Sequence, residues 1–195
     1  IRHHLRNAKF NFINTHESWA GSADWGRVYT TKNLLQIFQY TFTEYLPNIL
    51  IVQSSKGYFD PYREGPFFPS EEAAKKGILQ HYEDSRRALT ECKVLIVTPG
   101  QNEGWIDQTD GLAWAHKPPI EAFEAFGKDR FRVKQFSLEE NIENLTSSLD
   151  LLWAHNPETQ LIFTLSPVPS DATFYDTNVA VRSFENKAIL LLAVK

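Results

Sequence analysis

Short apolar runs predict the strands of this chain. The run Val94–Val97 is apolar and mostly β-branched, and it ends in Thr98–Gly100. An apolar run of this length without alternating polar positions is typical of a strand buried on both faces of a parallel sheet. A second, largely apolar run at Leu161–Leu165 ends in Ser166–Pro169, and Ile49–Val52 is a third, shorter candidate.

Apolar residues that recur every three to four positions predict helices between these strands. Helices are expected over residues 30–45, where Thr30 or Thr31 is the cap, and over residues 70–90, where two acidic residues occupy the first turn. A third helix, residues 137–155, opens with the Ser-x-x-Glu spacing of a capping box. The last helix begins near Ser183.

The alternation of helices and strands indicates βαβ units, an α/β fold with a mainly parallel sheet, and one domain over residues 1–195. Three stretches stay outside this pattern. Residues 1–29 show no sustained period. Residues 57–69 form an aromatic, irregular segment that either packs over the sheet edge or stacks on a ligand. Residues 99–136 are expected to be a long functional loop.

Composition narrows the class of protein. The 195 residues include no methionine, and the formal net charge of −4 argues against a nucleic-acid partner. No run approaches the roughly 20 apolar residues of a membrane span, so no membrane partner is expected. Cys92 is the single cysteine, which excludes an internal disulfide and favours a reducing, cytoplasmic location. The missing start methionine suggests a piece of a longer protein. The sequence does not indicate an oligomeric state.

The candidate site lies where the two best strands end. Parallel strands end at the same edge of a sheet, so the loops 100–105 and 166–178 are expected to be neighbours. Asn102 offers amide N–H groups to a developing negative charge, and Glu103 can carry a proton. Alternatively, these polar residues are simply a strand exit. His116 is a possible base but is more often structural.

No cofactor or metal is expected. No glycine-rich phosphate loop follows either strand, which argues against a nucleotide-binding domain. His3 and His4 are adjacent and have no third ligand at a suitable spacing, which argues against a metal site there.

Five segments together resemble the GSCFA-domain family in their order and spacing. The most specific segments are the first strand exit, with its Gly and Glu-x-Trp, and the Ser-Pro-Val-Pro exit. The five segments are residues 25–30, 60–63, 97–105, 165–169 and 186–190.

This resemblance implies a branch of the SGNH-hydrolase superfamily, whose three-layer, flavodoxin-like α/β/α domains often hydrolyse esters. It implies a small-molecule or glycan ester as substrate. Asn102 would donate to the oxyanion, Gly26 would assist with a backbone N–H, and Glu103 would orient the loop. The residues implied to surround the substrate are Gly100, Gln101, Trp105 and Ser166.

The chain also departs from the family. The name-giving Gly-Ser-Cys-Phe-Ala, which would supply the nucleophile, and the Asp-x-x-His block, which would supply the base, are both absent. Ser22 is a poor substitute because no apolar strand precedes it. We therefore expect the chain to be inactive in isolation. The alternative is a non-catalytic carbohydrate-binding or scaffolding module on the same fold.

Overall fold

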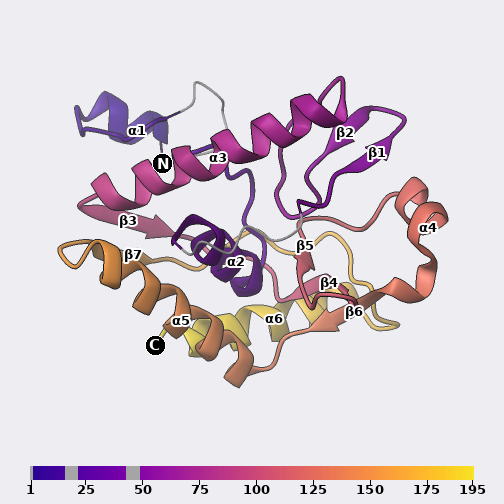
Figure 1. The fold of residues 1–195 in the computed structure, drawn as a ribbon. Helices are drawn as coiled ribbons and strands as arrows, with labels where there is room; N and C mark the ends of the chain where they lie inside the picture. Colours follow the sequence, from indigo (N-terminus) through magenta and orange to yellow (C-terminus); the bar gives the residue numbers. More distant parts are fainter. Residues whose placement is uncertain (1, 16–21, 43–48) are drawn as a thin grey trace.

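The computed structural model describes residues 2–15, 22–42 and 49–195, and Figure 1 shows their arrangement. The described strands form three small sheets, with helices between and beside them. The helices are α1 (Arg2–Asn7), α2 (Thr31–Phe42), α3 (Glu71–Glu91), α4 (Ile120–Phe126), α5 (Leu138–His155) and α6 (Val179–Ala193), with a short 3-10 turn at Lys128–Arg130. The strands are β1 (Val52–Ser54), β2 (Gly57–Phe59), β3 (Val94–Val97), β4 (Glu103–Asp107), β5 (Ala113–Trp114), β6 (Phe131–Gln135) and β7 (Gln160–Phe163).

The predicted helices are confirmed where the structure describes them. Ser70 caps α3 by accepting a hydrogen bond from Ala73 N, and Ser137 and Glu140 form the expected capping box of α5. Helix α2 is described to Phe42, and residues 43–45 of the expected helix lie outside the described residues. Helix α6 begins at Val179, four residues before the predicted start near Ser183, because Asn178 caps this helix by accepting a hydrogen bond from Ala180 N.

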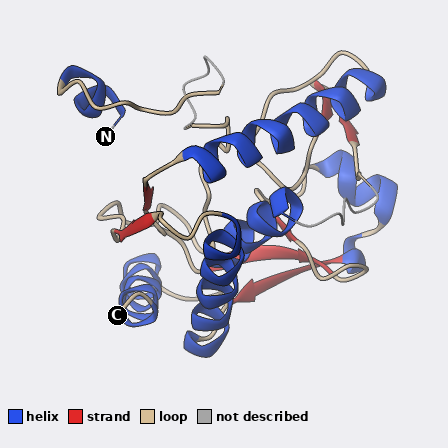
Figure 2. Ribbon diagram, turned by 60° about the vertical axis from the view of Figure 1, so that its left-hand side comes forward, coloured by secondary structure: helices blue, strands red, loops and turns tan. Residues whose placement is uncertain are grey.

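The expected α/β class is confirmed, but the mainly parallel central sheet is not. The described strands form mixed, small sheets. Strands β3 and β7 pair in parallel, with Leu95 opposite Leu161. A separate antiparallel sheet has the order β5-β4-β6, and β1 and β2 form an antiparallel pair. Figure 2 shows the strands in red as separate groups among the helices.

Much of the expected long loop at residues 99–136 is this antiparallel sheet. Strand β4 pairs with β6 from Glu103 opposite Gln135 to Asp107 opposite Phe131. Both strands are short and carry polar residues, so neither contains a continuous apolar run. The pairing of two segments far apart in sequence therefore supplies an order that local pattern does not predict.

Burial of β3 and β7 on both faces was a wrong expectation. Leu95 is buried against helices, whereas Val94 and Ile162 are each 47% exposed. Successive side chains of a strand point to opposite faces, so one face of this two-stranded sheet packs on the core and the other is uncovered.

The two larger of three apolar clusters among the described residues hold this part of the fold together. One joins α2, α3, β3 and α5, and consists of Leu34, Ile37, Phe38, Phe42, Leu89, Leu95, Leu145 and Leu152. The other joins the β1–β2 region to the antiparallel sheet and α4, and consists of Val52, Tyr62, Trp114, Ala122 and Phe131. The aromatic segment 57–69 thus packs: Phe59 lies edge-on to Trp114, with ring centroids 6.5 Å apart. The third predicted strand overlaps β1 only at Val52.

Candidate functional site

The exits of the two parallel strands meet, as the sequence predicts. Ser166 N donates a hydrogen bond to Pro99 O at 3.0 Å. A Cβ atom placed on Gly100 would lie 3.2 Å from Ser166 Cβ, so the two corners are in direct contact. This contact fixes one rim of a pocket at the carboxyl ends of β3 and β7, which is where open α/β sheets bind ligands.

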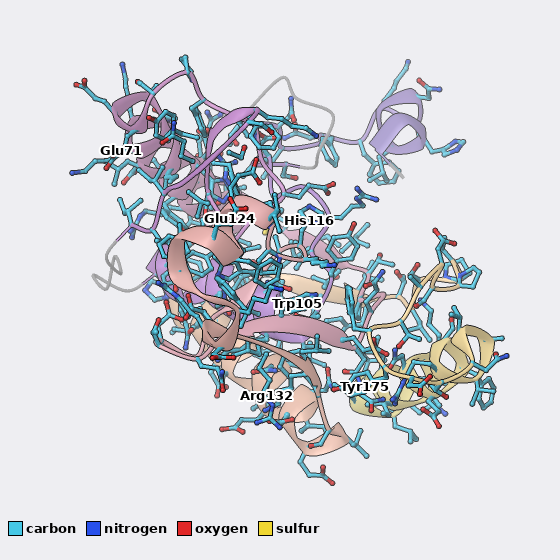
Figure 3. All side chains as sticks on the ribbon, turned by 90° about the vertical axis from the view of Figure 1, so that its right-hand side faces the viewer. Glu71, Trp105, His116, Glu124, Arg132 and Tyr175 are labelled. Carbon is cyan, nitrogen blue, oxygen red and sulfur yellow. The ribbon has the colours of Figure 1, made fainter. Side chains whose placement is uncertain are left out.

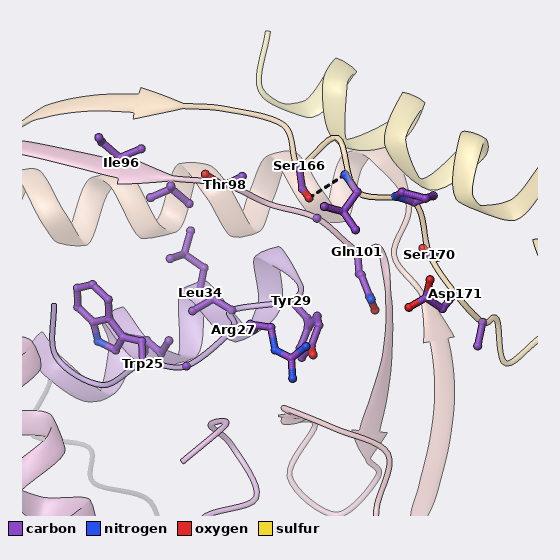
Figure 4. A pocket seen from close by; sticks show the side chains of 18 of the residues that line it. Trp25, Arg27, Tyr29, Leu34, Ile96, Thr98, Gln101, Ser166, Ser170 and Asp171 are labelled. Atoms are coloured by element: carbon purple, nitrogen blue, oxygen red, sulfur yellow. Dashed lines mark hydrogen bonds between the residues drawn. The ribbon is translucent and has the colours of Figure 1, made fainter. Parts of the chain in front are cut away.

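The pocket has a volume of about 670 Å³, within the usual range for small-molecule sites. Figure 4 shows it between β3 and the Trp25–Tyr29 segment with the start of α2. The apolar floor comes from Leu34, Ile37, Phe38, Leu95 and Val97. Polar groups gather at the rim: Tyr29, Gly100, Gln101, Ser166, Ser170 and Asp171.

Four of the predicted site residues line this pocket: Gly26, Gly100, Gln101 and Ser166. The backbone N–H of Gln101 donates to Tyr29 O at 3.1 Å, which ties the strand exit to the opposite wall. The Gln101 side chain lies at the pocket in Figure 4. Its amide can therefore donate to a bound carbonyl oxygen.

Asn102 lies elsewhere. Its side chain is fully buried and does not line the pocket. Its Nδ2 donates to Phe136 O at 2.7 Å, and its Oδ1 accepts from Asn141 Nδ2 at 2.7 Å. Adjacent side chains of an extended chain point apart. Gln101 therefore faces the pocket while Asn102 faces the protein interior, so the Asn102 amide does not reach the pocket in this arrangement.

Asn102 belongs to a chain of buried polar groups. Asn141 accepts a hydrogen bond from Thr31 Oγ1 at 2.8 Å, and Thr31 in turn accepts from Asn144 at 3.1 Å. These contacts connect the strand exit to the start of α2 and to α5. Because each buried polar group has a partner, the network fixes the position of Gln101 next to it.

Glu103 also faces away from the pocket and holds its outer wall. The carboxylate accepts hydrogen bonds from Thr173 Oγ1 at 2.9 Å, from Phe174 N at 3.2 Å and from Asn186 Nδ2 at 3.2 Å. Arg182 approaches it at 3.3 Å. Phe174 lines the pocket, so Glu103 positions the loop that forms this wall.

Trp105 supports the same wall from behind. It does not line the pocket, but its ring lies edge-on to Phe174 with centroids 5.2 Å apart. Its indole N–H is buried without a hydrogen-bond partner among the described residues. Trp105 therefore acts as packing, and Phe174, which the sequence did not single out, supplies the aromatic ring of this wall of the pocket.

Gly26 is required by a close backbone contact. Its φ of +68° is unfavourable for other residues, and an added Cβ would lie 2.3 Å from Glu64 O. Arg27 then pairs with the Glu64 carboxylate through its guanidinium and its backbone N–H. The Arg27 hydrogen bonds outweigh partial burial and hold the pKa of Glu64 below its usual value.

His116 lies outside the pocket, above Trp105 in the view of Figure 3. Its Nε2 is 3.7 Å from Glu64, and its ring lies edge-on to Tyr29 with centroids 5.5 Å apart. Burial lowers the pKa of His116 below its usual value, against the attraction of Glu64. No hydroxyl hydrogen-bonded to His116 is found within the described ranges, so the geometry gives it no nucleophile to activate.

Lys187 is a site residue that the sequence did not single out. Its Nζ donates to Gly100 O at 2.6 Å, and burial lowers its pKa below the usual value. The sequence offers two signals: Lys187 lies in the segment 186–190 that resembles the GSCFA family, and it is a cation beside the apolar stretch Ala188–Leu192 of α6. Lys187 fixes the Gly100 turn from the side of α6.

Two features are absent from the described residues. No cluster of three or more His, Cys, Asp or Glu side chains suited to a metal ion is found there. Within the same part of the chain, no helix is long and apolar enough to cross a membrane.

The comparisons with known proteins gave one match. The family model described as the GSCFA family matches residues 1–195, the whole chain. Among curated proteins and solved structures, no significant match is found.

Proposed function

Because the chain belongs to the GSCFA family, and because a polar rim meets an apolar floor at the ends of its parallel strands, we propose that it forms the substrate pocket of an SGNH-like ester hydrolase. The substrate class is a small ester or an acylated glycan. The observation that carries the proposal is the contact between Gly100 and Ser166, which joins both strand exits at one rim.

The pocket chemistry suits an ester. An acyl chain is uncharged and matches the floor formed by Leu34, Phe38 and Leu95, whereas a carbonyl oxygen needs a hydrogen-bond donor. The Gln101 amide is the donor in this proposal, and the backbone of Gly26 lies on the opposite wall. Donors fixed in place before the reaction stabilise the oxyanion of ester hydrolysis.

The other predicted residues act indirectly in this proposal. Asn102 holds the strand exit through Phe136 and Asn141, and Glu103 holds the outer wall. Trp105 packs behind Phe174. These residues therefore affect the shape of the pocket without touching the ester.

We expect the chain of residues 1–195 to bind an ester without hydrolysing it. Among the described residues, the hydroxyls that line the pocket (Tyr29, Thr98, Ser166 and Ser170) have no imidazole hydrogen-bonded to them. A hydroxyl without a base is a weak nucleophile. Turnover of 4-nitrophenyl acetate should therefore equal the buffer rate. Turnover that is lost in a Ser22→Ala variant would contradict this assignment.

Binding tests the pocket directly. Calorimetry with ethyl butyrate should give a measurable affinity that falls about two- to tenfold in Gln101→Ala, because one hydrogen bond is lost. Glu124→Ala is the matched control, since Glu124 is exposed on α4. Equal affinity in Gln101→Ala and Glu124→Ala would remove Gln101 from the site.

A non-catalytic carbohydrate-binding or scaffolding module is the second candidate. The observation that favours it is the lack of a hydroxyl–imidazole pair at the described pocket, together with Tyr29 and Phe174 among its lining residues. An aromatic ring can lie flat on a sugar face. Calorimetry with N-acetylglucosamine, a sugar that carries no ester, separates the two: binding of this sugar with no binding of ethyl butyrate favours the module.

A further inference from the structure

Among the described residues, the backbone groups along one edge of β3 have no backbone partner. In the β3–β7 ladder, Gln160 N donates to Lys93 O, Thr164 N to Val97 O and Ser166 N to Pro99 O. The backbone groups that bond to β7 therefore belong to alternate residues of β3, and the N–H and C=O groups of Leu95 and Val97 point toward β7. The N–H and C=O groups of Ile96 and Thr98 point to the opposite edge. No backbone hydrogen bond to these groups is found among the described residues.

The pocket runs along this edge. Four consecutive residues, Leu95–Thr98, line it, although their side chains alternate between the two faces of the sheet. A pocket that contacts every residue in turn lies beside the strand rather than over one face. Figure 4 shows the open side of β3 opposite Trp25 and Leu34.

The far side of this groove is a fixed wall. Trp25 Nε1 donates to Ser85 Oγ at 2.8 Å, which anchors the Trp25–Tyr29 segment to α3. The bond from Gln101 N to Tyr29 O closes the groove at its rim end. The groove is thus bounded on both sides, so a folded second copy cannot bring the edge of its own sheet into it.

The distribution of charge along the groove limits which ligands it can bind. The deep part is lined by apolar side chains from α2 and β3, and the charged lining residues Arg27 and Asp171 come from the Trp25–Tyr29 segment and the loop after Ser166. Burying a charge in the deep part would be costly. Unpaired backbone groups of a buried edge, in contrast, are satisfied by another backbone.

We propose that the deep part of the groove binds an extended, uncharged polypeptide segment, supplied from outside these 195 residues, which adds to β3 as a strand. The segment pairs with the N–H and C=O groups of Ile96 and Thr98 and buries β-branched side chains against Leu34, Ile37 and Phe38. Main-chain hydrogen bonds give such strand addition its affinity, and side-chain pockets give it specificity. This inference goes beyond ester binding: an ester places its carbonyl at the polar rim and its acyl chain on the same apolar floor, but it does not pair with the backbone of β3.

Hydrogen exchange tests whether this edge of β3 is unpaired in the protein alone. In the protein alone, the amides of Leu95 and Val97 should exchange at least about tenfold more slowly than those of Ile96 and Thr98, because only the former pair with β7. Equal protection of all four amides would show that the edge is already paired and would overturn the proposal.

A second hydrogen-exchange experiment adds a peptide and tests whether it pairs with β3. A short synthetic peptide of alternating valine and threonine, blocked at both ends, should slow exchange at Ile96 and Thr98 about tenfold or more. The matched control is the same peptide with its alternate backbone nitrogens methylated, which should give no protection. Equal protection by both peptides would exclude strand pairing and overturn the proposal. So would the absence of protection by the unmodified peptide.

Three further measurements distinguish a bound peptide from a bound ester and from a second copy of the chain. Thr98→Pro removes an N–H that faces the groove and should abolish peptide binding, with the fold checked by circular dichroism. Gln101→Ala should leave peptide binding unchanged even where it weakens ester binding, so the two proposals fail independently. Protection of Ile96 and Thr98 that rises with protein concentration alone, or that ethyl butyrate produces, would contradict a peptide occupant.

Discussion

Adjacent amides at the strand exit have opposite environments, and this difference determines their roles. Gln101 lines the pocket, whereas Asn102 is fully buried and hydrogen-bonded to Phe136 and Asn141. A one-residue shift along an extended chain reverses the direction of a side chain. The sequence identifies the polar exit, but which of its two amides faces the ligand depends on packing against α5.

Asn102 should therefore matter for stability. Asn102→Ala leaves Phe136 O and Asn141 Nδ2 without this partner in the interior, so the free energy of unfolding should fall by about 1–3 kcal/mol. Urea unfolding measures the change. Gln101→Ala is the neighbouring control and should change stability by about 0.5 kcal/mol or less. An Asn102→Ala variant with unchanged stability but weaker ester binding would show instead that Asn102 contacts the ligand.

Other residue roles also depended on tertiary structure. Gly100 and Ser166 were recognisable because strand exits share one edge of a parallel sheet. Lys187 and Phe174 were not, because a helix and a loop distant in sequence bring them to the site. Trp105 was expected at the pocket, but the antiparallel pairing of β4 turns it toward Phe123 and Phe174 instead.

At the scale of elements, the helices were predictable because their signals are local. Ser137 and Glu140 satisfy the first N–H groups of α5 within four residues of sequence. The sheet β5-β4-β6 was missed because its pairing is non-local and its strands are short. Strand β3 was found, but the uncovered face of its sheet was not, since a run of apolar residues does not tell how many faces are covered.

The cap of α5 gives a test at this scale. Ser137→Ala removes the hydroxyl that accepts from Glu140 N, so the free energy of unfolding should fall by about 1 kcal/mol. Thr146→Ala, an exposed change in the middle of α5, is the control and should be neutral or slightly stabilising. Chemical denaturation compares the two. An equal effect of both variants would mean that the cap contributes nothing specific.

Asp107 makes the β4–β6 pair sensitive to pH. Burial alone would raise its pKa, but hydrogen bonds from Arg130 and Thr109 outweigh burial and lower the pKa below its ordinary value of 3.8. A lowered pKa contributes stability above the ordinary value, and this contribution is lost as pH falls through the folded-state pKa.

Asp107→Asn should therefore be less stable than the natural chain at pH 6, and the difference should shrink below about pH 4. Urea unfolding of both proteins at pH 6 and pH 3 measures this. Asp110→Asn is the control for a nearby carboxylate that receives no hydrogen bond from Arg130. A stability difference that is the same at both pH values would show that Asp107 does not act through its charge.

At the scale of the whole molecule, large apolar residues are exposed on β7 and α6. Ile162 is 47% exposed, and Phe184 and Leu192 are more exposed still. Exposed apolar patches favour association. Light scattering should show a mass that rises with protein concentration, and Phe184→Lys should reduce this rise, whereas Glu124→Lys should not. A constant monomer mass at all concentrations would contradict this prediction.

One titration tests the central claim, that ligands bind where the exits of β3 and β7 meet. In ¹H–¹⁵N NMR spectra, ethyl butyrate should shift the amide signals of Tyr29, Gly100, Gln101 and Ser166, which share this rim. Signals on α4, such as that of Glu124, should not move. Shifts that cluster on α4 or along the uncovered face of α6, with the four rim signals unchanged, would place the ligand elsewhere and contradict the account.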